Sequence, residues 1–119
     1  QMFLNTGAYG GEHFLSDSVL SDFTRCQFCE TGNRRGAGFD KPTPDGSWGP
    51  TCNCISLESF GHSGFTGTLA WADPDKRVVY VFLSNRVYPD ATNNKLVKLG
   101  TRTRIMQVIY DAIEKSENR

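Results

Sequence analysis

The pattern of apolar residues in the second half of the chain predicts a small antiparallel sheet. Every residue from Val78 to Leu83 is apolar, and a strand of this kind is covered on both faces. Turn residues at positions 73–76 separate this run from a shorter apolar segment before it. The predicted strands are Gly61–Gly64, Thr68–Asp73 and Arg77–Ser84.

Helical periodicity follows at the C-terminal end of the chain. A helix is predicted over Thr101–Lys115, with its apolar residues on one stripe: Ile105, Val108, Ile109, Ala112 and Ile113. We expect that stripe to pack across one face of the sheet, with Ile109 buried and Tyr110 beside the contact.

A shorter helix is predicted near the N-terminal end, capped by Ser16 or Asp17. It places Val19, Leu20 and Phe23 on one face. Either this helix or a partner outside the chain is expected to cover the second face of the sheet.

The middle of the chain combines a short strand with a long connection. Gly36–Phe39 is predicted as a strand whose small residues allow close packing, and residues 40–58 contain prolines and glycines without periodicity. Trp48 in this connection is expected to cover the core. These elements predict one α+β domain over residues 1–119, an antiparallel sheet with the C-terminal helix packed on one face.

Charge and hydropathy argue against some partners. Thirteen Lys and Arg residues balance thirteen Asp and Glu residues, and no run of like charge occurs. This balance argues against nucleic acid or an anionic membrane surface as a partner. The longest apolar run is far shorter than a membrane span, so no spanning segment is expected.

The four cysteines occur as Cys26-x-x-Cys29 and Cys52-x-Cys54. Four thiolates could close a tetrahedral zinc site, and the same cysteines could form disulfides or remain free. Zinc ligands usually have two to four residues between them, and Cys52 and Cys54 have one, which favours disulfides or free thiols. The sequence indicates no other cofactor.

The candidate chemistry lies just before the hairpin, in Phe60–Thr68. Glycines recur there at every third position and allow the backbone to approach a ligand or to turn sharply. His62 and Ser63 add a titratable ring and a hydroxyl. Without further context the glycines would indicate only a bend. Arg34 and Arg35 could bind a carboxylate, although a solvated loop pair is favoured.

Several motifs, in order and with matching spacing, make the chain resemble a known family. They are Gly38–Pro42 (Gly-Phe-Asp-Lys-Pro), Gly61–Thr68 (Gly-His-Ser-Gly-Phe-Thr-Gly-Thr), Trp71–Pro74 (Trp-Ala-Asp-Pro) and Phe82–Pro89 (Phe-Leu-Ser-Asn-Arg-Val-Tyr-Pro). The chain resembles the C-terminal part of the serine β-lactamase and penicillin-binding-protein superfamily. It is similar to the branch of esterase-like and D-alanyl-D-alanine-peptidase-like hydrolases whose third motif begins with histidine in place of lysine.

The resemblance implies roles for four residues. His62 would replace the lysine as a proton donor and a source of positive potential, and Ser63 would hydrogen-bond the substrate. Gly64 would let the substrate lie flat against the strand, and the Phe65 N–H would be one of two oxyanion donors. Because an imidazole is mostly neutral at neutral pH, the histidine weakens the fixed charge and favours ester or peptide hydrolysis over β-lactam recognition.

Two motifs of that family are absent from the chain. No serine is followed by lysine three residues later, and no tyrosine by asparagine two residues later. We therefore expect a C-terminal segment of a serine hydrolase of cell-wall peptides, β-lactams or esters, which is inactive alone. The alternative is a non-catalytic binding or structural module stapled by its cysteines.

The resemblance also implies a setting. Such domains follow glycoside hydrolase family 3 β-N-acetylglucosaminidase domains in Bacteroides-like bacteria, so the periplasm or cell envelope is expected. The expected partners are the remainder of the parent hydrolase and a small-molecule or peptide substrate. A truncated sheet would expose an edge at the His62 strand, which would favour self-association.

Overall fold

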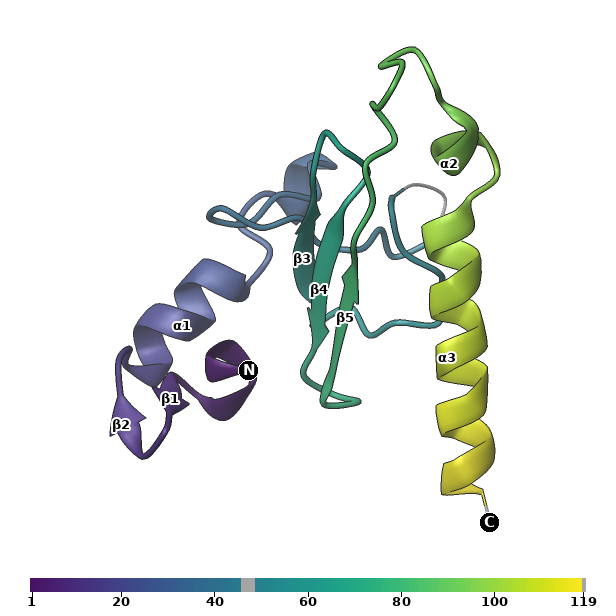
Figure 1. Cartoon of the computed structure of the whole chain (residues 1–119). Coiled ribbons are helices and arrows are strands. Elements are labelled where there is room, and N and C mark those ends of the chain that lie inside the picture. Colours follow the sequence, from purple (N-terminus) through teal and green to yellow (C-terminus); the bar gives the residue numbers. More distant parts are fainter. Residues whose placement is uncertain (46–48, 119) are drawn as a thin grey trace.

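The structure is a computed structural model that describes residues 1–45 and 49–118, so the expectation for Trp48 lies outside the described residues. Two small strands and a short helix come first, and a three-stranded sheet and a long helix follow (Figure 1). In chain order the elements are η1 (Met2–Asn5), β1 (Ala8–Tyr9), β2 (Glu12–His13), α1 (Asp17–Thr24), η2 (Cys29–Thr31), β3 (Phe60–Ser63), β4 (Leu69–Asp73), β5 (Val78–Phe82), α2 (Lys95–Lys98) and α3 (Thr101–Glu117).

The main sheet is antiparallel with strand order β3-β4-β5, which confirms the predicted α+β architecture. Gly61 of β3 pairs with Trp71 of β4. A side chain at Gly61 would collide with the carbonyl oxygen of Ala70 and with the Trp71 ring, so this position holds the two strands in close contact. The sheet therefore requires a glycine in β3.

The predicted strand at Gly36–Phe39 is wrong. This segment is a tight turn in which the Gly36 N–H donates to the Phe39 carbonyl, 2.8 Å away, and Gly38 has a φ of +85°. The turn brings Arg35 opposite Asp40, and Asp40 then pairs with Gly61 at the edge of β3. Small residues serve the turn here rather than close packing of a strand.

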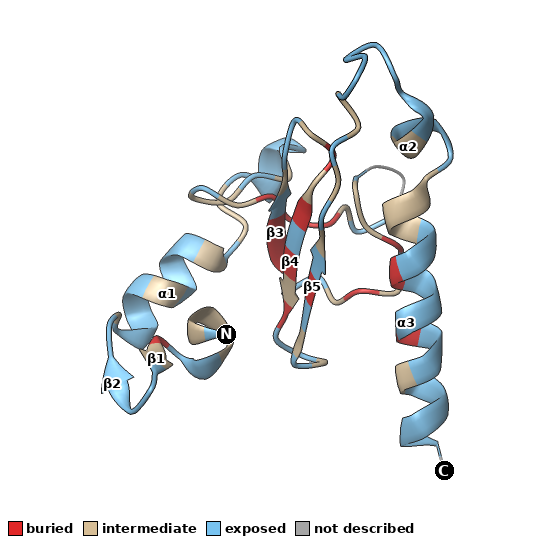
Figure 2. Ribbon diagram, in the orientation of Figure 1, coloured by how far each residue is buried: buried red, intermediate tan, exposed pale blue. Residues whose placement is uncertain are grey.

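The hydrophobic core lies between the inner face of the sheet and α3, with the loop around Cys52 and Ile55 between them (Figure 2). The sheet contributes alternate residues of β4 together with Tyr80 of β5. The buried members of this cluster are Cys52, Ile55, Leu69, Trp71, Tyr80, Met106 and Tyr110.

The predicted helix is present, but the stripe expected to pack on the sheet is not its buried face. Met106 and Tyr110 are buried, whereas Ile109 is 36% exposed and Val108 is more exposed still. In the first turn of the helix, the Tyr80 hydroxyl also donates a hydrogen bond to the Arg102 carbonyl, 3.2 Å away. The expectations for Ile109 and Tyr110 are therefore both wrong.

The short helix α1 is capped as predicted, since the Ser16 hydroxyl accepts a hydrogen bond from the Val19 N–H at 3.4 Å. None of its residues is buried, and Val19 and Phe23 are exposed. The helix therefore does not bury its apolar face on the sheet.

The outer face of the sheet is covered only in part. Phe60 of β3 packs in an aromatic cluster with Phe3 and Phe39, whose ring centroids lie 6.0 and 5.1 Å from its own. Val79 and Val81 of β5, which point to the same face, are exposed. The open part of this face therefore lies over β5.

The cysteines form two disulfides, Cys26–Cys29 and Cys52–Cys54. Residues 1–45 and 49–118 contain no group of three or more His, Cys, Asp or Glu side chains placed to hold a metal ion. Within the same ranges, no helix has both the length and the apolar character that a membrane crossing requires.

Candidate functional site

The candidate residues lie at the end of β3 and in the turn that follows it. The Gly64 N–H donates to the Thr68 carbonyl at 2.8 Å, and the Gly67 N–H donates to the Gly64 carbonyl at 3.0 Å. A side chain at Gly64 would collide with the Thr68 hydroxyl, and Gly67 has a φ of +90°. The two glycines are therefore needed to close this turn tightly against the start of β4.

His62 and Ser63 lie on opposite faces of β3, because side chains alternate along a strand. His62 pairs with Ala70, whose partner in β5 is the exposed Val81, so the imidazole lies on the open face. Ser63 pairs with the buried Leu69 on the inner face and is itself partly exposed. His62 and Ser63 are adjacent in the sequence, but their side chains point to opposite faces of the sheet.

Both ring nitrogens of His62 have a partner. Nδ1 lies 2.8 Å from the Ser63 carbonyl oxygen, and Nε2 lies 3.2 Å from Nη1 of Arg35. A carbonyl only accepts and a guanidinium only donates. The two contacts are satisfied together when the proton is on Nδ1 and Nε2 accepts from Arg35.

Sequence reasoning considered Arg35 as a carboxylate-binding residue and favoured a solvated loop, but it did not predict the contact of Arg35 with His62. Its Nη1 lies 2.7 Å from Oδ1 of Asp40, whose side chain is 3% exposed. Asp40 exchanges two main-chain hydrogen bonds with Gly61, at 2.7 and 3.1 Å, beside His62. No local spacing predicts this contact, because 27 residues separate Arg35 from His62 and a turn brings them together.

Phe65 follows the motif glycine and is 74% exposed. The Arg86 guanidinium lies 5.1 Å from the centre of its ring, and the Arg86 N–H donates to the Thr66 carbonyl at 2.9 Å. Among the described residues, the Phe65 N–H has no hydrogen-bond acceptor. The hydrogen-bond network of the described residues therefore does not use this N–H.

A buried carboxylate fixes the opposite end of the sheet. Asp73 accepts hydrogen bonds from the Ser56 N–H, the Ser56 hydroxyl and the Tyr110 hydroxyl, at 3.0, 2.7 and 2.8 Å. Burial alone would raise its pKa, but these hydrogen bonds and one from the Lys76 N–H outweigh burial and lower the pKa of Asp73. The same carboxylate and burial raise the pKa of Tyr110.

A second buried charge lies one residue beyond Asp40. The Lys41 ammonium donates to the Glu58 carbonyl at 2.8 Å, and burial lowers the pKa of Lys41.

Four residues were given roles from the resemblance. Three of them lie at the end of β3 and in the turn after it, where Arg35 contacts His62: His62, Gly64 and Phe65. Ser63 belongs to the same strand end but points to the inner face.

Comparison with known proteins gives two findings. A family model described as "Beta-lactamase" matches residues 21–101. Proteins of Salmonella paratyphi B, Salmonella newport and Salmonella heidelberg, each named "Putative D-alanyl-D-alanine carboxypeptidase", are 32% identical to this chain over 97 residues. The match covers 81% of this chain and 22% of each relative, so the chain spans about a fifth of the length of these relatives.

Proposed function

The chain belongs to the beta-lactamase family, and from that premise we propose that it is the third-motif segment of a serine hydrolase that cleaves cell-wall peptides, esters or β-lactams by acyl transfer. The observation that carries this proposal is the Phe65 N–H, which belongs to an exposed residue just beyond β3 and has no acceptor among the described residues. An N–H fixed in this way stabilises the oxyanion of an acyl-transfer intermediate.

The neighbouring residues would hold the substrate against the strand. The resemblance places Gly64 against the substrate backbone, while the space that a Gly64 side chain would occupy is filled by the Thr68 hydroxyl. Ser63 offers a hydroxyl to a ligand oxygen. His62 would stand near the reacting centre in the place of the family's lysine. The nucleophile and its base would come from the remainder of the hydrolase, since the chain has no Ser-x-x-Lys sequence.

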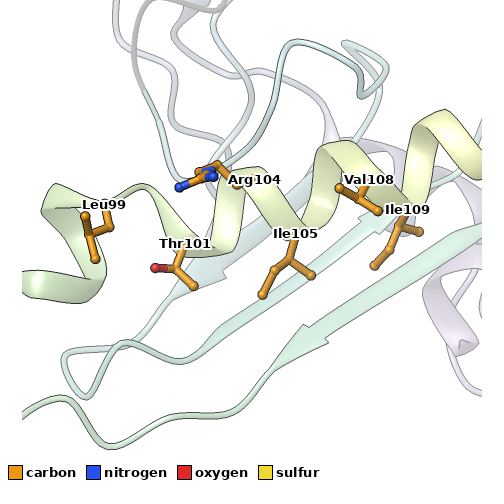
Figure 3. Close-up of a pocket in the computed structure, with 6 residues that line it drawn as sticks. All are labelled: Leu99, Thr101, Arg104, Ile105, Val108 and Ile109. Carbon is orange, nitrogen blue, oxygen red and sulfur yellow. The ribbon is translucent and has the colours of Figure 1, made fainter.

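Exposed apolar surface supports a partner of this kind. One side of α3 forms an open groove that is lined by four apolar side chains, one threonine and one arginine (Figure 3): Leu99, Thr101, Arg104, Ile105, Val108 and Ile109. The outer residues of the edge strand β5, Val79 and Val81, are exposed as well. We assign these exposed apolar side chains to contacts with the rest of the parent hydrolase domain.

The cellular location of the protein and the domain that precedes the chain are also part of the proposal. The names of the Salmonella relatives refer to cell-wall chemistry, which supports a location in the periplasm or cell envelope. The assignment to the His-Ser-Gly branch rests on the resemblance of Gly61–Thr68. The preceding glycoside hydrolase family 3 domain rests on the resemblance of the chain as a whole. The edge strand β5 would also permit self-association of the isolated chain, whereas Asp40 already pairs with Gly61 at the edge of β3.

A substitution that removes the main-chain N–H of residue 65 in the complete parent hydrolase tests the proposed oxyanion role of that N–H. Phe65→Pro removes the N–H, whereas Phe65→Leu keeps it and serves as the matched control. We expect Phe65→Pro to lower kcat on a p-nitrophenyl ester by about 100-fold or more, with Phe65→Leu close to the wild type. Equal kcat values in the two variants, both folded, would contradict the proposed site.

The second candidate function is a non-catalytic binding or structural module. The absence of a nucleophile motif from the chain and the two disulfides in its loops favour it. A fluorescent penicillin or a fluorophosphonate distinguishes the two functions, because it labels a serine of the complete parent protein only if that protein is a serine hydrolase.

A further inference from the structure

The contact between Arg35 and His62 assigns a role to an arginine that the proposed function does not use. His62 stands at the position for which the resemblance implies a lysine in other branches of the superfamily. A guanidinium lies 3.2 Å from that histidine, on the exposed side of the strand. We propose that Arg35 positions the His62 ring in its Nδ1–H form and supplies the permanent positive charge of this site.

The first step of the argument is how Arg35 is held. Its Nη1 is 2.7 Å from the Asp40 carboxylate, and that carboxylate is almost completely buried. Asp40 is fixed in turn by its two main-chain hydrogen bonds with Gly61. The guanidinium is therefore tied to the edge of β3 through the residue next to His62.

The second step is what the contact does to the imidazole. An arginine has no acceptor atom, so the 3.2 Å contact is a hydrogen bond only when Nε2 of His62 is unprotonated. The proton then resides on Nδ1, which donates to the Ser63 carbonyl at 2.8 Å. A His62 held in this way accepts a hydrogen bond and carries no charge.

The third step is the consequence for a ligand. The side chain of Arg35 is 53% exposed, and Nη1 is the only one of its three nitrogens with a contact among the described residues. A guanidinium binds carboxylates through paired N–H groups. A ligand carboxylate lying along β3 would therefore form an ion pair with the Arg35 guanidinium. This part of the inference rests on the proposed function.

The test for positioning uses this 119-residue chain and needs no enzymatic activity. Nitrogen NMR of the His62 ring at neutral pH distinguishes the two neutral forms. We expect the wild type to show the Nδ1–H form, and Arg35→Ala to shift the ring to the Nε2–H form. Arg25→Ala, which removes an exposed arginine paired with Asp22, is the matched control and should leave the ring unchanged.

An Nε2–H ring in the wild type would overturn the proposal without any variant. An unchanged ring in Arg35→Ala, with an otherwise native amide spectrum, would overturn it as well. Arg35→Lys, which keeps a donor and a charge, should restore part of the Nδ1–H population.

The ligand part is tested in the complete parent hydrolase. Arg35→Ala should raise KM at least tenfold for a peptide ending in a free carboxylate, and leave KM for the corresponding peptide amide within twofold. An equal change for both substrates would overturn the charge assignment. If the parent hydrolyses neither substrate, the proposed function and this ligand fail together, and the NMR result still decides whether Arg35 positions His62.

Discussion

The Tyr110 hydroxyl donates a hydrogen bond to Oδ2 of Asp73 over 2.8 Å, which joins the middle of α3 to the last residue of β4. Both side chains are buried. A buried carboxylate requires hydrogen-bond donors to offset its loss of hydration, and Asp73 obtains them from the Ser56 loop, from the hairpin turn and from α3. The position of the helix is therefore set by a polar contact at the edge of the apolar core.

The first prediction concerns that contact. Tyr110→Phe removes the hydroxyl and keeps the ring, so it should lower the free energy of unfolding by about 1.5–3 kcal/mol, the range for a hydrogen bond to a charged group. Urea denaturation of the chain measures the change. Tyr88→Phe at an exposed tyrosine is the control and should change stability by no more than about 0.5 kcal/mol.

A second prediction compares two apolar residues of α3. Met106 is buried in the core and Ile109 lies on the open groove. Met106→Ala should cost about 2–5 kcal/mol, because it leaves a cavity, and Ile109→Ala about 1 kcal/mol or less. Denaturation curves of both variants decide the rotation of the helix. A larger loss for Ile109→Ala than for Met106→Ala would show that the Ile109 face packs on the sheet.

The three strands of the main sheet and the start of α3 could be predicted because local patterns determine them. Continuous apolar residues between Val78 and Leu83 specify a strand, and the period of the C-terminal segment specifies a helix. The expectation that this strand is covered on both faces is wrong, because Val79 and Val81 are exposed. The rotation of that helix could not be predicted in the same way. The stripe containing Ile109 is the more apolar face, and the helix buries Tyr110 instead because Asp73, 37 residues away, accepts its hydrogen bond.

The candidate site was predictable to a similar extent. The motif of His62, Ser63, Gly64 and Phe65 could be recognised from consecutive residues, and the structure places it at a strand end and a turn. The contact of His62 with Arg35 depends on a turn at Gly36–Phe39 that the sequence suggested to be a strand. Because the turn was predicted as a strand, the contact between Arg35 and His62 could not be predicted.

The third prediction is a dependence of stability on acid. Hydrogen bonds lower the pKa of Asp73 in the folded chain, so its contribution to stability is fully present above about pH 5 and is lost as the pH falls through the ordinary carboxyl range toward the folded pKa. Tyr110→Phe removes one of these hydrogen bonds and should flatten the loss. Thermal unfolding of both proteins between pH 5 and 2.5 measures it, and parallel curves would contradict the role of Asp73.

The last prediction concerns the activity of the chain by itself. Acylation by this family requires a serine activated by a lysine three residues later, and none of the serines in this chain has one. Under the proposed function, the Phe65 N–H and His62 would stabilise an intermediate that another part of the hydrolase forms. The isolated chain should therefore hydrolyse neither a chromogenic β-lactam nor a p-nitrophenyl ester above background, and it should not react with a fluorophosphonate.

Mass spectrometry after incubation with the fluorophosphonate provides the decisive measurement, with heat-unfolded chain as the control for nonspecific labelling. Stoichiometric labelling of Ser63 or any other serine in the folded chain alone would show that it carries its own nucleophile, and the assignment of the nucleophile to the remainder of the hydrolase would then be wrong.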